Sequence, residues 1–210
     1  MEGLDVRWGM AIAGFEVWEE GVRVRFDDGT VTRGSLLVGA DGSGSRTRRF
    51  LVGEEVGRLN QLPVRLIGVT LRLTPEEVKP LRDIDPLLFQ GCHPDTGDYL
   101  WYSILSTPEV NGSMGGDEYY EGQLNLSWIV KSPEDEVPTS NNDKIAKMKR
   151  MASNFEPRLR KVIQEIPEDS EALEIKLQDW PTRDWKSPGG RVTLIGDAAH
   201  AMTMCRSSIS

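Results

Sequence analysis

Two short stretches decide the fold: LLVGADGSGSR at residues 36–46 and VTLIGDAAHAM at residues 192–202. In each, an apolar run without polar alternation ends in a glycine and an aspartate, as expected of a strand that is covered on both faces in a parallel sheet and then turns into a helix. The carboxyl ends of parallel strands open into a crevice, and glycine lets a ligand approach the backbone. These two junctions are therefore the candidate ligand-binding sites, and their aspartates are suited to accept hydrogen bonds from sugar or polyol hydroxyls.

The segments around the junctions predict an α/β protein. Residues 8–32 indicate antiparallel hairpins, with turns at Glu19-Glu20-Gly21 and Asp27-Asp28-Gly29. The apolar and turn patterns predict further strands at residues 66–73, 87–90, 99–105, 124–131, 173–177 and 191–195, and loops at 111–122 and 132–142. Helices are predicted at residues 46–52, 145–155 and 159–166, and a further helix begins near Ala198. The middle of the chain is thus an antiparallel sheet followed by two amphipathic helices.

Composition excludes several classes of protein. The 210 residues include 33 acidic and 25 basic side chains, a net charge of -8, so nucleic-acid binding is not expected. The longest apolar run covers five residues, 36–40, far short of a membrane span, and the first residues lack a secretory signal, which together predict a cytoplasmic location. Two cysteines, Cys92 and Cys205, and two histidines, His93 and His200, predict neither a disulfide framework nor a metal site.

The two junctions together resemble the second and third flavin-binding signatures of the single-component FAD-dependent monooxygenases. The resemblance rests on Gly39-Ala40-Asp41-Gly42, on Ser45-Arg46 and on Gly196-Asp197-Ala198-Ala199-His200. That family includes hydroxylases of the para-hydroxybenzoate and salicylate hydroxylase type and many oxygenases of fungal secondary metabolism. Either motif alone occurs as a plain turn in many α/β proteins, whereas the pair in this order, separated by a strand-rich insertion, is specific.

The resemblance implies an α/β fold of the para-hydroxybenzoate hydroxylase type in two parts. Residues 1–56 and 185–210 would form a partial FAD/NAD(P)-binding domain, and residues 57–184 a substrate domain with a mixed antiparallel sheet and two helices. It implies cofactor-binding roles for Gly39, Asp41, Gly42, Arg46, Gly196, Asp197, Ala198, Ala199 and His200. In that scheme Asp41 and Gly42 lie near the phosphates of FAD and NAD(P)H, Arg46 supports their turn, and Asp197 holds the ribityl chain of FAD. Residues 198–200 would begin the helix that faces the flavin and its pyrophosphate.

The activity that the resemblance implies is monooxygenation. NAD(P)H would reduce bound FAD, and one oxygen atom of O₂ would enter a small organic substrate by hydroxylation or epoxidation. No residue is assigned as catalytic, because His200 at a helix start is expected to be structural. Four aromatic residues lie on predicted strands of the sheet that in the family forms the substrate pocket, but core packing is expected for each of them: Tyr99, Trp101, Tyr102 and Trp128.

The chain departs from the family pattern in two places. Residues 3–14 have neither the spacing nor the preceding strand of a GxGxxG unit, and residues 203–210, TMCRSSIS, replace a glycine-rich stretch. These departures predict weak flavin binding and an open apolar edge at residues 36–40 that favours aggregation or a partner chain.

Three alternatives stay open: a catalytically inactive fragment of the same origin, another FAD enzyme of this fold such as a halogenase or reductase, and a sugar- or nucleotide-binding module unrelated to flavin.

Overall fold

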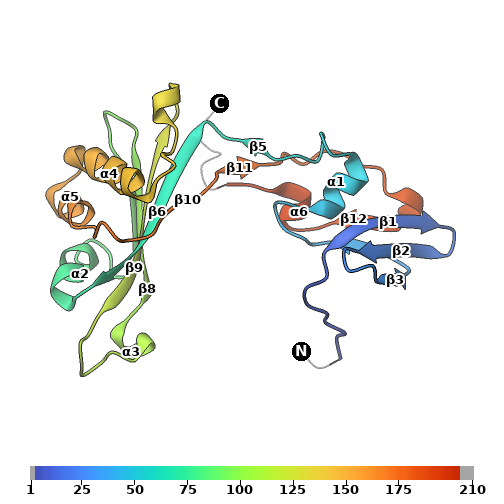
Figure 1. The fold of residues 1–210 in the computed structure, drawn as a ribbon, viewed down its shortest axis with the longest axis horizontal. Helices are drawn as coiled ribbons and strands as arrows, with labels where there is room; N and C mark the ends of the chain where they lie inside the picture. Colours follow the sequence, from blue (N-terminus) through green and yellow to red (C-terminus); the bar gives the residue numbers. More distant parts are fainter. Residues whose placement is uncertain (1–2, 204–210) are drawn as a thin grey trace. The chain divides into compact units, whose positions relative to one another are not determined.

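The chain folds into two compact units in a computed structural model that describes residues 3–203, without the side chain of Asn154 (Figure 1). Unit 1 comprises the residues up to Leu62 and those from Gln178 onward, and unit 2 comprises Pro63–Leu177. Residues 57–62 and 178–184 belong to unit 1, where strand β5 (Asn60–Gln61) pairs with strand β11 (Gln178–Asp179). The predicted α/β fold class is confirmed by this mixture of sheets and helices.

An antiparallel sheet of three strands opens unit 1. Its strands are β1 (Ile12–Trp18), β2 (Gly21–Phe26) and β3 (Val31–Gly34), in that order. The turn between β2 and β3 is closed by Asp28, whose Oδ1 accepts hydrogen bonds from the Thr30 amide at 2.8 Å and its hydroxyl at 2.7 Å. The hairpins predicted from alternation and turn residues are therefore confirmed.

The second sheet of unit 1 is a parallel pair made from both ends of the chain. Strand β4 (Leu37–Gly39) leads into helix α1 (Arg46–Val52), and strand β12 (Val192–Leu194) leads into helix α6 (Asp197–His200). A 3-10 turn at Pro188–Gly190 precedes β12. The predicted parallel strands are confirmed, but the prediction that both faces of residues 36–40 are covered is wrong. Leu36 is 52% and Val38 41% exposed, whereas Leu37 is half-buried and Gly39 buried, so only one face of this stretch is covered within residues 3–203.

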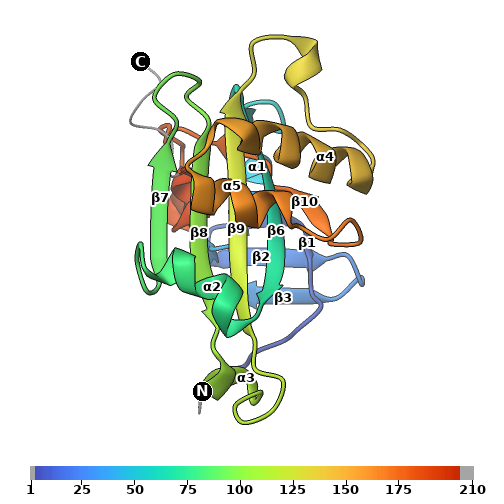
Figure 2. The ribbon, with the colours of Figure 1, turned by 90° about the vertical axis from the view of Figure 1, so that its left-hand side faces the viewer.

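Unit 2 is an antiparallel five-stranded sheet with helices on one face (Figure 2). The strand order is β10 (Ala172–Glu174), β6 (Val64–Leu73), β9 (Tyr120–Ile129), β8 (Tyr99–Ser106) and β7 (Leu88–Cys92). The helices are α2 (Pro75–Arg82), α4 (Asn141–Met151) and α5 (Pro157–Gln164), with the short α3 (Pro108–Asn111) between β8 and β9. Two 3-10 turns, Pro133–Asp135 and Ala152–Asn154, flank α4.

Three sequence expectations for unit 2 need correction. Helix α2 was not predicted, although Thr74 and Glu77 form a capping box at its start. Strand β9 begins at Tyr120 inside a predicted loop, because residues 120–122 pair with the end of β6. Of the four aromatic residues assigned to the core, Tyr102 and Trp128 are buried beneath the helices. Tyr99 and Trp101 are half-buried and alternate with core residues on β8, so they lie on the opposite face.

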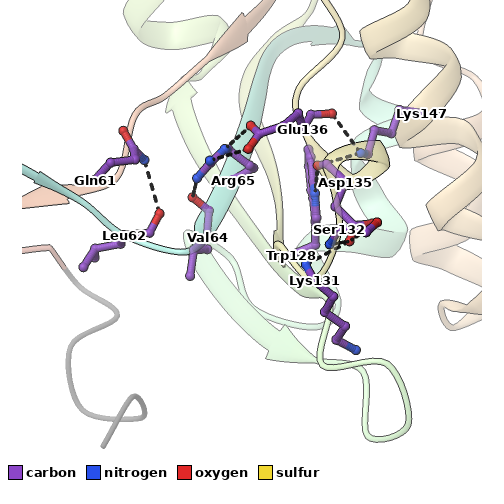
Figure 3. A network of polar contacts seen from close by, with 10 residues as sticks. All are labelled: Gln61, Leu62, Val64, Arg65, Trp128, Lys131, Ser132, Asp135, Glu136 and Lys147. Carbon is purple, nitrogen blue, oxygen red and sulfur yellow. Dashed lines mark hydrogen bonds and ion pairs between the residues drawn. The ribbon is translucent and has the colours of Figure 1, made fainter.

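A polar network fixes the loop between β9 and α4 (Figure 3). Arg65 donates to both carboxylate oxygens of Glu136, at 2.6 and 2.7 Å. The Trp128 indole and the Lys147 ammonium both donate to the carbonyl of Asp135, at 2.6 and 2.9 Å. Burial lowers the pKa of Lys147, whose ammonium lies 4.4 Å from the centroid of the Trp128 ring. All these groups are engaged with each other, which indicates a structural role for the network.

Neither a membrane-spanning helix nor a cluster of metal-ligating side chains is present within residues 3–203. No helix within residues 3–203 is long and apolar enough to cross a membrane. In the same range no group of three or more histidine, cysteine, aspartate or glutamate side chains is arranged to hold a metal ion. Cys92 is an exposed free thiol, and Cys205 lies outside the described residues.

Candidate functional site

The two glycine–aspartate turns leave the same end of the β4–β12 pair. Leu194 lies opposite Gly39, and the Ile195 amide donates to the Gly39 carbonyl at 2.9 Å. A Cβ atom at Gly39 would lie 2.7 Å from a Leu194 methyl and 2.8 Å from a Thr47 methyl, so only glycine fits between the strand partner and α1. The pairing therefore brings together two motifs that lie at opposite ends of the chain.

The carboxylate of Asp41 is engaged by the helix that follows it. Its Oδ1 accepts from the Ser45 hydroxyl at 2.5 Å, and its Oδ2 accepts from the Thr47 amide at 2.9 Å and the Thr47 hydroxyl at 3.0 Å. Partial burial raises the pKa of Asp41, but these hydrogen bonds outweigh burial, and the pKa lies below its ordinary value. Asp41 thus fixes the start of α1 from within the turn.

The Asp197 turn is open by comparison. The Asp197 side chain is exposed, and its carboxylate has no hydrogen-bond partner within the described part of the chain. Gly196 has φ 59° and ψ -146°, a conformation that favours glycine, and a Cβ atom there would meet no atom within 4 Å. Gly42 in the other turn, with φ 74°, has the same open surroundings. The backbone of both turns is accessible to a ligand at these glycines.

The remaining predicted residues of the second junction are divided between core and surface. Ala198 and Ala199 are buried and pack with Leu194. His200 is exposed, and its backbone amide donates to the Gly196 carbonyl at 3.1 Å, which closes the single turn of α6. The two alanines therefore seat the turn on unit 1, while Gly196, Asp197 and His200 lie at its surface.

Arg48 is the residue that connects the two turns, and sequence reasoning missed it. Its side chain is 1% exposed and donates to four backbone carbonyls: those of Ser43, Gly57 at 2.9 Å, Asp197 at 3.3 Å and Ala198 at 3.1 Å. Its guanidinium also lies 4.9 Å from the ring centroid of the buried Trp180. Burial lowers the pKa of Arg48, against the opposing effect of the Asp41 charge. The sequence signal for its burial was its spacing: Arg48 lies three residues before Leu51, so both are on the inward side of α1.

Arg46, which was predicted to support the Asp41 turn, lies elsewhere in unit 1. Its guanidinium donates to Asp27 at 2.6 Å and to the Ile12 carbonyl at 3.2 Å, and it is largely exposed. It therefore ties α1 to the hairpin of β1 and β2, whereas Arg48 contacts the carbonyls of both turns. The site as a whole offers one unpaired carboxylate and two accessible glycines on a rigid frame, an arrangement suited to a ligand rich in hydroxyl and phosphate oxygens.

The chain was compared with known proteins, and no family model matches it. It is 54% identical, over 98% of its length, to the FAD-dependent monooxygenase dbaB of Emericella nidulans, of which it covers 53%. It is 34% identical, over 88% of its length, to the FAD-dependent monooxygenase tazP of Aspergillus terreus, of which it covers 47%. The chain thus spans about half the length of the curated relatives it matches.

Solved structures resemble the fold of the chain. The 2,6-dihydroxypyridine-3-hydroxylase of Arthrobacter nicotinovorans superposes with a TM-score of 0.64 at 21% identity, over 91% of this chain and 49% of that one. Klebsiella pneumoniae HpxO, solved with FAD and uric acid, superposes with a TM-score of 0.63 at 19% identity, over 91% of this chain and 43% of that one. At these identities the likeness concerns the fold alone.

Proposed function

We propose that this chain, a relative of the FAD-dependent monooxygenases over about half of their length, forms part of the flavin site of such an enzyme and the sheet domain that receives its substrate. The resemblance that was inferred from the two junctions is confirmed by these relatives. The observation that carries the proposal is the parallel pairing of β4 with β12, which brings both junctions to one end of the sheet.

The geometry of unit 1 fits FAD. Asp197 is exposed and unpaired, so its carboxylate can accept hydrogen bonds from ribityl hydroxyls. Gly42 and Gly196 leave the backbone open to phosphate oxygens, and Gly39 keeps the two turns close. Asp41 and Arg48 act as positioning residues behind them. Bound FAD, reduced by NAD(P)H, would supply the oxygen chemistry, while the chain binds and orients the cofactor.

The two units divide this work in the proposal. Unit 1 serves as the partial FAD-binding domain, and unit 2 as the substrate domain for a small organic molecule. The acidic net charge of -8 argues against nucleic acid as a partner, and the cytoplasm is the proposed location.

Titration with flavins tests the proposal. Binding of FAD is expected to be weak, with a dissociation constant on the order of 0.1–1 mM, because the chain offers few charged contacts to the adenosine half. FMN, which keeps the ribityl chain and one phosphate, should bind about as well as FAD, and ADP should not compete with it. Flavin fluorescence quenching measures all three. Stoichiometric FAD on the purified chain would contradict weak binding. If the chain does not quench flavin fluorescence at 1 mM FMN, the proposed site is wrong.

A further inference from the structure

The loop between α3 and β9, residues 112–119, lies at one end of the unit 2 sheet (Figure 2). Asn111 ties the two ends of this loop together. Its Nδ2 donates to the Tyr119 carbonyl at 2.9 Å, and its Oδ1 accepts from the Ser113 amide at 3.0 Å. The Ser113 hydroxyl in turn accepts from the Tyr119 amide at 3.2 Å. The shape of the loop thus depends on one neutral amide side chain.

The loop carries an aromatic ring onto strand β6. The Arg72 guanidinium lies 3.6 Å from the centroid of the Tyr119 ring, a cation–π contact between the loop and the sheet. Arg72 is an exposed residue, and Tyr119 is half-buried. Because Asn111 holds the backbone of Tyr119, it also holds this contact.

Asn111 is followed by Gly112, and this is the only Asn-Gly pair in the sequence. The backbone nitrogen that follows an asparagine can attack the side-chain amide carbon, and a side chain on the following residue hinders the attack. Gly112 has no side chain, is exposed and has φ 76°, which glycine adopts without strain. A Cβ atom there would meet no atom within 4 Å, so its surroundings leave room for the chain to bend. Every other asparagine precedes a larger residue: Asn60, Asn125, Asn141, Asn142 and Asn154.

The hydrogen bonds of the Asn111 amide favour the same attack. The Ser113 amide donates to Oδ1, the oxygen on which negative charge develops when a nitrogen adds to Cγ, and a donor at that place stabilises the charge. Asn111 is half-buried and Gly112 exposed, so water reaches this side of the loop. Nucleophile, oxyanion donor and water are therefore together at one peptide bond.

We propose that Asn111–Gly112 is a site of spontaneous deamidation. The Gly112 nitrogen forms a bond to the Asn111 Cγ, the Cγ–Nδ2 bond breaks, and Nδ2 leaves as ammonia with the proton of the Gly112 amide. The product is a five-membered succinimide ring. Water then opens this ring at either carbonyl, which gives aspartate or isoaspartate. The reaction needs neither an oxidant nor a cofactor.

Deamidation changes what holds the loop. The Nδ2 donor to the Tyr119 carbonyl is replaced by a carboxylate oxygen, which is ionised at neutral pH, so two acceptors then face each other. The new charge also adds to those of Asp117 and Glu118 in the same loop. Isoaspartate further lengthens the main chain by one carbon. The modification thus releases Tyr119 from Arg72 and converts an ordered loop into a mobile one.

Peptide mapping by mass spectrometry tests the site on the full chain, incubated at mildly alkaline pH. Asn111 should deamidate at least about tenfold faster than each of the other five asparagines, which are internal controls. Gly112→Ala should slow the reaction at Asn111 about tenfold or more. Ser113→Ala keeps the Asn-Gly pair and the backbone amide at position 113, so the rate should stay within about twofold.

Hydrogen exchange tests the consequence separately. Asn111→Asp, which reproduces one product, should speed exchange of the Tyr119 amide by about fivefold or more. Asn142→Asp makes the same charge change in the first turn of α4 and should leave the loop unchanged. Circular dichroism shows that each variant is folded.

Two results would overturn the proposal. Deamidation of Asn111 no faster than that of the other asparagines would remove the site. Exchange of the Tyr119 amide that Asn111→Asp leaves unchanged would show that the Asn111 amide does not hold the loop. Neither measurement depends on flavin binding, so this proposal and that of the flavin site stand or fall separately.

Discussion

The turns at Asp41 and Asp197 look alike in sequence and differ in what their carboxylates do. Both turns follow a short parallel strand and lead into a helix, and Asp197 is itself the first residue of α6. Asp41 gives both oxygens to Ser45 and Thr47 inside its own turn, whereas Asp197 is exposed and has no partner within residues 3–203. The same local motif thus serves folding at one junction and leaves an acceptor for a ligand at the other.

The largest effect should follow from removing the side chain that holds both turns. Arg48→Ala leaves the carbonyls of Ser43, Gly57, Asp197 and Ala198 without their donor in a buried place. We expect a loss of about 3–5 kcal/mol in the free energy of unfolding, the range for breaking a buried charged interaction. Urea denaturation followed by tryptophan fluorescence measures it, because Trp180 stacks on Arg48.

Arg46→Ala is the matched control for this prediction. It removes an equal side chain two residues away, whose ion pair with Asp27 is exposed. Its expected effect is below about 1 kcal/mol. A loss at Arg46 equal to that at Arg48 would contradict the assignment of Arg48 as the side chain that holds the two turns.

The next effect concerns the open turn. Asp197→Ala should weaken flavin binding by roughly tenfold to a hundredfold, which corresponds to one lost charge-assisted hydrogen bond of about 1.5–3 kcal/mol. His200→Ala should change the affinity less, because its ring has no assigned ligand contact. Fluorescence titration at high FMN concentration compares the two variants. Equal affinities of the wild-type chain and Asp197→Ala would exclude a direct contact with flavin.

Local signals in the sequence were sufficient for much of unit 1. Apolar runs and turn residues located both junctions and helix α1 (Arg46–Val52), and hairpin turns located β1 and β2. The same signals did not show which partner each side chain takes. Arg48 donates to the Asp197 carbonyl 149 residues away, and the Asp41 carboxylate accepts from Ser45 and Thr47 within its own turn.

Unit 2 shows the other limit of sequence reasoning. The predicted strands overlap all five strands of its sheet, but alternation alone does not say which face the helices cover. Tyr102 and Trp101 are neighbours with similar side chains, and only the packing of the helices buries the first and leaves the second on the opposite face. Helix α2 was not predicted, although its capping box at Thr74 and Glu77 directly follows the apolar strand β6.

A smaller effect is expected from neutralising the closed turn. Asp41→Asn keeps the shape but replaces one acceptor oxygen by a donor facing the groups of Ser45 or Thr47. We expect a loss of about 1–2 kcal/mol in unfolding free energy, less than the sum of charge-assisted bonds because the carboxylate is partly solvated. Asp197→Asn, the corresponding change in the open turn, should alter stability by less than about 0.5 kcal/mol.

The pH dependence of stability is a second test of the role of Asp41 in its turn. The folded pKa of Asp41 lies below its ordinary value of 3.8, so its stabilisation is complete above that value and is lost as the pH falls through the folded pKa. Acid denaturation of the wild-type chain should therefore include a loss of stability below about pH 4 that Asp41→Asn lacks. Identical acid profiles would show that the Asp41 hydrogen bonds do not persist in solution.

A substitution at the open edge of β4 is expected to have the smallest effect on stability and a measurable effect on self-association. Leu37 and Gly39 pair with β12, so the backbone groups of Val38 face away from that partner, and its side chain is largely exposed. Such an edge recruits other strands. We expect the wild-type chain to self-associate and to bind an apolar dye. Val38→Lys should reduce both, because a charge on a strand edge opposes pairing. Val110→Lys makes the same charge change at an exposed loop helix and should have little effect. Size-exclusion chromatography with dye binding decides: a wild-type monomer without dye binding would mean that unit 1 closes its own edge.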